Sequence, residues 1–175
     1  IANQNSAFSG RSVYVLYQDR TDDNQLSANS ILNSSLSENI SLTAGANFRK
    51  LRSHNHQNLL DLLGGQYFLD IDPFYSGDAS QSDLNNPNRQ IGENETYGYN
   101  YLLHALTFDG FTQFKFTYDK ADFYLAQSFS RTEYQREGLY RNGIYANNSF
   151  GKGERVTFEN FGFKGGLTYK LNGRN

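Results

Sequence analysis

Apolar and polar side chains alternate one by one along several stretches of this chain. The clearest case is 113–130, which is interrupted by a short polar turn at 119–122. On either side of that turn, one face of the chain carries Phe114, Phe116, Tyr118, Phe123, Leu125 and Phe129. Alternation with a period of two around a short polar turn predicts a β-hairpin.

Four further stretches repeat the pattern, at 24–36, 40–49, 100–118 and 156–170. We therefore predict about five antiparallel strands, with 12–19 either a sixth strand or the upper part of the strand at 24–36. The alternation also predicts two faces. The residues expected on the apolar face include Leu32, Leu42, Phe116, Leu125 and Phe163. Those expected on the polar face include Asn33, Thr43, Lys115, Ala126 and Lys164.

The connections between these strands are of two kinds. Those at 37–39, 119–122 and 171–174 are short and polar, whereas 55–98 and 139–155 are long and rich in Asn, Asp, Gly, Ser and Tyr. Short and long connections alternate, which is typical of outer-membrane β-barrels with short periplasmic turns and long extracellular loops. Within the first long connection, "NLLDLLGG" predicts a short helix that ends at Gly64 and Gly65.

Composition agrees with a β-rich protein, because 15% of the residues are aromatic and there are 16 Gly but only 2 Pro. The absence of Cys excludes disulfides and cysteine nucleophiles. A net charge of −2 gives no electrostatic reason to expect a nucleic-acid partner. No nucleophile–base pair or carboxylate dyad stands out, so we expect neither an enzyme nor a cofactor.

A soluble sandwich or barrel would show the same alternation, with its apolar faces turned inward. Three features favour a membrane barrel instead. The polar face is rich in Asn, Ser, Thr, Gln and Gly, which suits a wet lumen. Tyr118, Tyr124 and Tyr169 lie near the short-turn ends, where aromatic girdles are found. Strands of about 10 residues are long enough to cross a bilayer.

Two groups of residues are candidates for contact with a ligand. The first combines aromatic rings with polar groups at the bases of the long loops, which suits sugars or peptides, and consists of Tyr97, Tyr99, Tyr101, Tyr140, Arg141 and Asn142. The second is Arg131, in a run with Glu133, Arg136 and Glu137 that we expect to form cross-strand pairs. Packing of girdle and loops is the alternative role for the tyrosines.

Metal ligands are suggested only weakly. His54 and His56 offer two imidazoles but no evident third ligand, so we interpret them as solvated loop histidines. The loop acids Asp70, Asp72, Asp78 and Asp83 are candidates for calcium, but their spacing fits no EF-hand and solvated acids are the alternative. We therefore predict no metal site.

Several blocks of the sequence resemble the barrel region of TonB-dependent outer-membrane receptors of the Bacteroidetes type. They are "YVLYQDRTDDNQLSAN" (14–29), "DLLGGQYFLDIDPF" (61–74), "DLNNPNRQIGENETYGYNY" (83–101), "YQREGLYRNG" (134–143) and "NSFGKGERVTFENFGFKGGLTYKLNGR" (148–174). The resemblance implies a plugged barrel of about 22 strands in the bacterial outer membrane. It also implies import of a scarce nutrient, such as a siderophore, glycan or peptide, with energy delivered through TonB.

The same resemblance implies that residues 1–175 form a partial barrel domain, a middle segment without the plug domain and the closing C-terminal strand. The expected partners are outer-membrane lipid, the rest of the barrel and plug, the TonB complex and a surface lipoprotein. Two alternatives remain open: a structural or adhesive outer-membrane barrel, and a soluble carbohydrate-binding β-protein.

Overall fold

The computed structural model describes residues 10–171, and this part of the chain is all-β without an α-helix. No helix within it is long and apolar enough to cross a membrane. The elements in chain order are β1 (Arg11–Ser12), β2 (Leu16–Ser37), β3 (Ile40–Asp61), β4 (Tyr67–Leu69), the 3₁₀-helix η1 (Gly77–Ser80), β5 (Gln90–Ile91), β6 (Thr96–Thr117), β7 (Ala121–Gly138) and β8 (Gly151–Tyr169).

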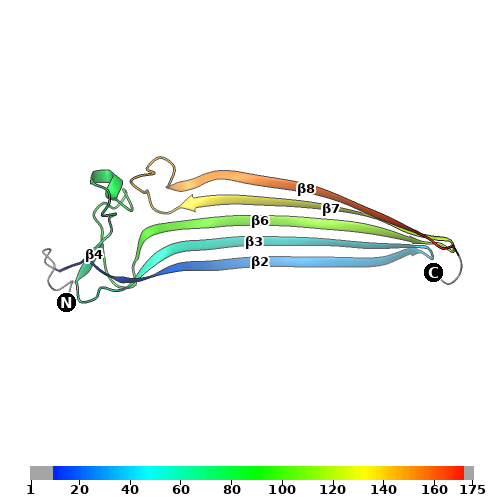
Figure 1. Cartoon of the computed structure of the whole chain (residues 1–175), viewed down its shortest axis with the longest axis horizontal. Helices are drawn as coiled ribbons and strands as arrows, with labels where there is room; N and C mark the ends of the chain where they lie inside the picture. Colours follow the sequence, from blue (N-terminus) through cyan, green and yellow to red (C-terminus); the bar gives the residue numbers. More distant parts are fainter. Residues whose placement is uncertain (1–9, 172–175) are drawn as a thin grey trace. The chain divides into compact units, whose positions relative to one another are not determined.

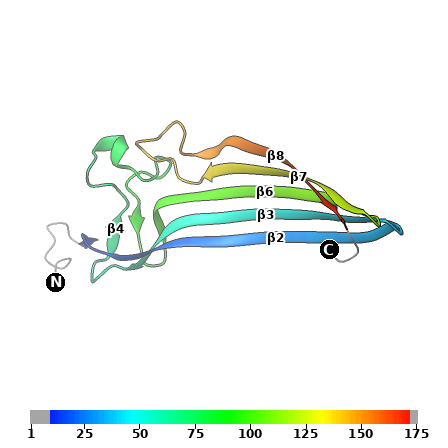
Figure 2. The same cartoon turned by 45° about the vertical axis from the view of Figure 1, so that its right-hand side comes forward.

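Five long strands form the main antiparallel sheet, in the order β2-β3-β6-β7-β8 (Figures 1 and 2). The order in the sheet is thus the order in the chain. β2 and β3 are joined by a turn at Glu38 and Asn39, and β6 and β7 by residues 118–120. Among the described strands, β2 and β8 each have one neighbour, so both edges of the sheet are open.

The five strands predicted from the alternation are confirmed, and the second half of 12–19, from Leu16 on, belongs to the start of β2. Both long connections are shorter than predicted, at 62–95 and 139–150, because β3, β6 and β8 extend further than expected. The turn expected at 119–122 is displaced, since β7 begins at Ala121. The turn expected at 171–174 lies, apart from residue 171, outside the described residues.

The predicted helix at "NLLDLLGG" is wrong, because residues 58–61 continue β3. Leu59 donates its N–H to the carbonyl of Glu95 (3.0 Å) and accepts a hydrogen bond from Asn94 N–H (2.8 Å). Asn94 and Glu95 come directly before β6, and their bonds satisfy both backbone groups of Leu59 without a helix. Leu63 and Gly64 then adopt left-handed conformations, with φ of 52° and 88°, and turn the chain away from β3.

The contacts of the chain divide it into two compact units. The first contains the residues up to Asn24, Arg52–His104 and Gln135–Arg155. It holds a small hydrophobic core of Leu59, Leu62, Ile91 and Tyr97, against which Val15 and Phe68 pack. A small sheet lies within the same unit, in which β4 pairs with β1 in parallel and with β5 antiparallel.

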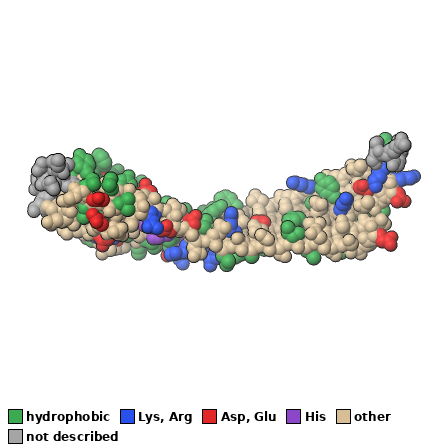
Figure 3. Space-filling view, turned by 90° about the horizontal axis from the view of Figure 1, so that it is seen from below, with side chains coloured by type: hydrophobic (Ala, Val, Ile, Leu, Met, Phe, Trp, Pro, Cys, Tyr) green, Lys and Arg blue, Asp and Glu red, His purple; other side chains and the backbone are tan. Residues whose placement is uncertain are grey.

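The second unit contains Gln25–Leu51, Ala105–Tyr134 and the residues from Val156 onward. None of its described residues is buried. Large apolar side chains are instead exposed, and Leu32, Leu125, Phe161 and Phe163 have relative exposures of 56, 59, 72 and 78%. Figure 3 shows hydrophobic side chains at the surface of the molecule among polar ones. This part of the sheet therefore has no core of its own.

The two predicted faces of the second unit are visible in its side-chain contacts. On the apolar face, Phe116 stacks on Phe123 (4.4 Å between ring centroids), and Phe129 contacts Phe161 (5.0 Å). On the polar face, the Thr43 hydroxyl donates to Asn33 Oδ1 (3.0 Å), as expected for two residues predicted to share that side.

Aromatic rings also occur on the polar face, where they cover glycines. A Cβ at Gly45 would collide with the ring of Phe111, and one at Gly166 with the ring of Tyr124. Glycine permits the close approach of a ring to the backbone at both positions.

Candidate functional site

Arg89 is the centre of a hydrogen-bond network within the first unit. Its Nη2 donates to Asp70 Oδ2 (2.8 Å), to the hydroxyl of Tyr140 (2.7 Å) and to the carbonyl of Thr96 (2.6 Å). Its guanidinium carbon also lies 4.7 Å from the centroid of the Tyr140 ring. Asp70 is 4% exposed, and its second carboxylate oxygen accepts the N–H of Gly98 (2.9 Å). Arg89 thus ties the first long connection to the start of β6 and, through Tyr140, to the second long connection.

A cavity of about 290 Å³ with a mixed polar and apolar lining lies next to this network in the first unit. It is lined by Gln57 and Phe68, by Asp70–Asp72 and Ala79–Ser82 of the first long connection, by Tyr97 and Gly98 of β6, and by Asn142 and Ile144. Its volume is near the lower end for small-molecule sites, which combine apolar walls with a few polar groups. Its lining combines amide, hydroxyl and carboxylate groups with aromatic rings, a combination suited to sugar hydroxyls or peptide amides.

The ring hydroxyls at this site are neutral at physiological pH. Burial raises the pKa of Tyr97 to about 12, and the neighbouring Tyr17 and Asp70 act in the same direction. Burial also raises the pKa of Tyr140, although its hydrogen bond with Arg89 opposes the shift. Both groups therefore keep their protons, and the Tyr140 hydroxyl donates to the carbonyl of Thr96 (2.9 Å).

The two long connections of the first unit are docked on each other through their backbones. Leu84 N–H donates to the carbonyl of Arg141 (2.7 Å), and Gly143 N–H donates to the carbonyl of Gln81 (2.9 Å). Asp83, which is buried, accepts the N–H of Arg141 (3.0 Å). These bonds form the side of the cavity that contains Gln81 and Asn142.

Gly143 leaves no room for a side chain at this contact, because an added Cβ would collide with the Asp78 carbonyl group. We expect Gly143→Ala to separate the two connections at a cost of about 1–3 kcal/mol, the usual range for overpacking. Hydrogen exchange at the Gly143 and Leu84 amides should become faster. Gly92→Ala is the matched control, since its Cβ would meet only Glu95 side-chain atoms at 3.6 and 4.0 Å. Equal exchange in both variants would contradict the role of Gly143.

Of the four tyrosines predicted as ligand contacts, two lie at or beside the cavity and two are not part of its lining. Tyr97 lines the cavity and Tyr140 belongs to the Arg89 network beside it. Tyr99 lies apart from the cavity lining and donates its hydroxyl to Asp19 (2.8 Å). The ring of Tyr101 is covered by the guanidinium of Arg136, 4.9 Å from its centroid.

The polar candidates are divided in the same way. Asn142 lines the cavity, and its Oδ1 also accepts the N–H groups of Ile144 (3.0 Å) and Tyr145 (3.2 Å). Arg141 donates from Nε to the carbonyl of Ala146 (3.0 Å) and thereby fixes its own loop. Arg131 belongs to the second unit, where it pairs with Glu133 (2.7 Å) and across strands with Glu159 (3.2 Å).

The four loop aspartates do not gather into one cluster within the described residues. Asp70 and Asp83 are buried and bound to protein donors, as described above. Asp72 accepts the N–H of Phe74 (2.9 Å), and Asp78 lies in η1. Asp70 and Asp83 thus hold the loops together through direct hydrogen bonds.

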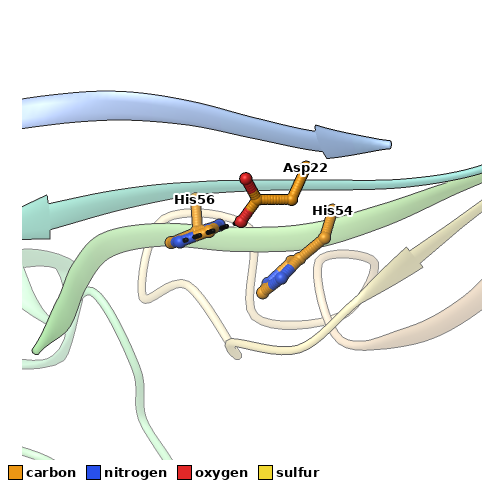
Figure 4. Close-up of side chains that lie close together, drawn as sticks. All are labelled: Asp22, His54 and His56. Atoms are coloured by element: carbon orange, nitrogen blue, oxygen red, sulfur yellow. Dashed lines mark ion pairs between the residues drawn. The ribbon is translucent and has the colours of Figure 1, made fainter. Parts of the chain in front are cut away.

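The interpretation of His54 and His56 as solvated loop histidines is wrong, because both lie on β3 and His56 is buried. Asp22 of β2 lies beside them, with its Oδ2 4.0 Å from His56 Nε2 (Figure 4). Burial lowers the pKa of His56 below its usual value and His54 acts in the same direction, so the ring is neutral at pH 7. This group forms because β2 and β3 extend further than the strands predicted at 24–36 and 40–49.

Sequence reasoning missed Arg89, Gln57 and Gln81. One signal was present for Arg89, which is the only Lys or Arg between Arg52 and Lys115, in a segment that carries many carboxylates. A lone cation in such a segment is a natural partner for a buried acid. Nothing local distinguishes Gln57 or Gln81 from the other polar residues.

No family model, no curated protein and no solved structure matches this chain.

Proposed function

We propose that this chain forms part of the wall and outer loops of an outer-membrane β-barrel receptor that imports a scarce nutrient. One observation carries the proposal. The second unit exposes Leu and Phe side chains on one face of a long antiparallel sheet and has no buried described residue. An apolar face of this kind needs a cover, and lipid provides one without a second protein layer.

The lengths of the strands and connections support the same proposal. The strands contain 18 to 22 residues, and about 9–11 residues are enough to cross the hydrocarbon core. The ten residues nearest the short turns then cross the membrane, and the remainder of each strand extends beyond it. The long connections, with the Arg89 network and the cavity, stand on the extracellular side.

The cavity in the first unit is the proposed place of first contact with the nutrient. Tyr97 and Phe68 contribute ring surface, and Gln57 and Asn142 contribute amide groups. The amide of Gln81 is bonded to Asn88 through both its nitrogen (3.1 Å) and its oxygen (2.7 Å). Such a lining fits a sugar ring or a short peptide segment. As in the receptors that the sequence resembles, passage into the cell would use a plug and energy delivered through TonB.

Topology can be tested with single cysteines, because the chain has none of its own. Ser76 is exposed and makes no capping hydrogen bond to η1, and Lys120 is exposed in a short turn. On intact cells we expect Ser76→Cys to react with a membrane-impermeant maleimide and Lys120→Cys to stay unlabelled. After lysis both should react. Labelling of Lys120→Cys alone on intact cells would invert the topology, and labelling of neither after lysis would refute exposure.

A further inference from the structure

Three potential metal ligands meet where β2 and β3 lie side by side in the first unit (Figure 4). Asp22, His54 and His56 each offer one ligand atom, and these atoms all lie within 4.8 Å of one another. The two imidazole rings stack, with centroids 4.2 Å apart and planes 23° from parallel. Asp22 comes from β2 and the two histidines come from β3. The backbone pairing of these two strands therefore holds the three ligands in place.

We propose that Asp22, His54 and His56 bind one divalent transition-metal ion, with zinc as the representative ion and one coordination position left open. Zinc is bound by His nitrogen and carboxylate oxygen at about 2.0–2.2 Å, which places ligand atoms about 3–3.5 Å apart. The separation of 4.0 Å between His56 Nε2 and Asp22 Oδ2 closes to that value with a shift of less than about 1 Å. Two imidazoles with one carboxylate select zinc, copper or nickel over calcium and magnesium, which prefer oxygen ligands.

His54 is already oriented as a ligand by a residue behind it. Its Nε2 lies 2.6 Å from Asn100 Oδ1, and because an amide oxygen only accepts, Nε2 carries the hydrogen. The lone pair on Nδ1 is then available to a metal. Bound histidines commonly make such a hydrogen bond with their second nitrogen, which fixes the tautomer and the orientation of the ring.

His56 and Asp22 have binding capacity that the described residues do not satisfy. The side chain of His56 is 8% exposed, and its Nε2 lies 4.0 Å from Asp22 Oδ2. This distance is too long for a direct hydrogen bond but suits two groups that share an ion. Asp22 pairs through Oδ1 with Arg20 (3.0 Å), which leaves Oδ2 directed at His56.

Zinc competition with a chromogenic chelator tests the proposal, with the full chain in detergent micelles. We expect one zinc ion per chain. His54→Gln and Asp22→Asn should each weaken zinc binding at least tenfold, and Asn100→Ala about 10–100-fold through loss of orientation. His104→Gln is the matched control, because the third histidine pairs with Glu137 (2.9 Å) outside the cluster and should leave zinc affinity unchanged.

A second readout counts the ligands directly. With Cu²⁺, electron paramagnetic resonance should show coupling to two imidazole nitrogens in the parent chain and to one in His54→Gln. Thermal unfolding shows whether each variant is folded. If His54→Gln does not fold, the zinc affinity of Asp22→Asn decides the test, because this substitution nearly keeps the shape of the side chain. The proposal is overturned if the parent chain takes up no zinc, or if folded cluster variants match it or the His104→Gln control in zinc affinity.

Discussion

Leu125→Arg is expected to lower the free energy of unfolding in lipid by about 2–4 kcal/mol, the cost of an arginine on the lipid face near the bilayer midplane. Leu125 is 59% exposed on the apolar face of β7. It lies five positions beyond the short turn that ends at Lys120, which is the middle of a crossing of about ten residues. Reversible urea unfolding in lipid vesicles measures the change.

Ala126→Arg is the matched control, because Ala126 is at the same depth and belongs to the polar face. Its cost should be much smaller, since in the proposed barrel a long cation at this position would reach water in the lumen. Equal penalties for the two substitutions would show that the sheet has no lipid face. A larger penalty for Ala126→Arg would reverse the assignment of the faces.

Arg89→Met is expected to open the loop network and to cost about 3 kcal/mol, because Asp70 is left buried without its partner cation. Arg89 itself is partly exposed, so the lower end of the range for broken buried pairs applies. The Gly98 amide, which donates to Asp70, reports the change directly. Its hydrogen exchange should become about 100-fold faster, the equivalent of this energy.

Arg131→Met is the comparison that isolates the effect of burial. Arg131 also contacts two carboxylates, but it is exposed, and ion pairs in water contribute little because solvent screens them. We expect almost no change in hydrogen exchange in that variant. If Arg89→Met also left hydrogen exchange unchanged, the network would be a consequence of the loop conformation and not a cause of it.

The sheet was predictable from the sequence because alternation is a local signal. The contacts of Phe116 with Phe123 and of Thr43 with Asn33 connect residues that the pattern had placed together. The helix expected at 58–65 failed because its Leu spacing is also local, whereas the hydrogen bonds of Leu59 with 94 and 95 are not. Tertiary pairing there overrides helix propensity.

The candidate site was less predictable, because its partners are far apart in sequence. Arg89 stands out as the lone cation of its segment, but nothing near Asp70 indicates which of the many acids it will pair with. The group around His54 was within reach of simple register arithmetic. Residues equally distant from position 38 lie opposite each other, as in Asn33 and Thr43 (38 − 33 = 43 − 38), and the same rule pairs Asp22 with His54 (38 − 22 = 54 − 38). Underestimating the length of the strands concealed this relationship.

The identity of strand order and chain order has a consequence for the time course of assembly. Each strand of the main sheet pairs with the one made just before it, so the sheet can grow by successive addition of neighbouring segments. The bonds between the two long connections, such as that from Leu84 to Arg141, join segments separated by the whole of β6 and β7. If the sheet grows in this order, those bonds form only after β6 and β7 have paired. The cavity is therefore completed late, after the sheet that supports it.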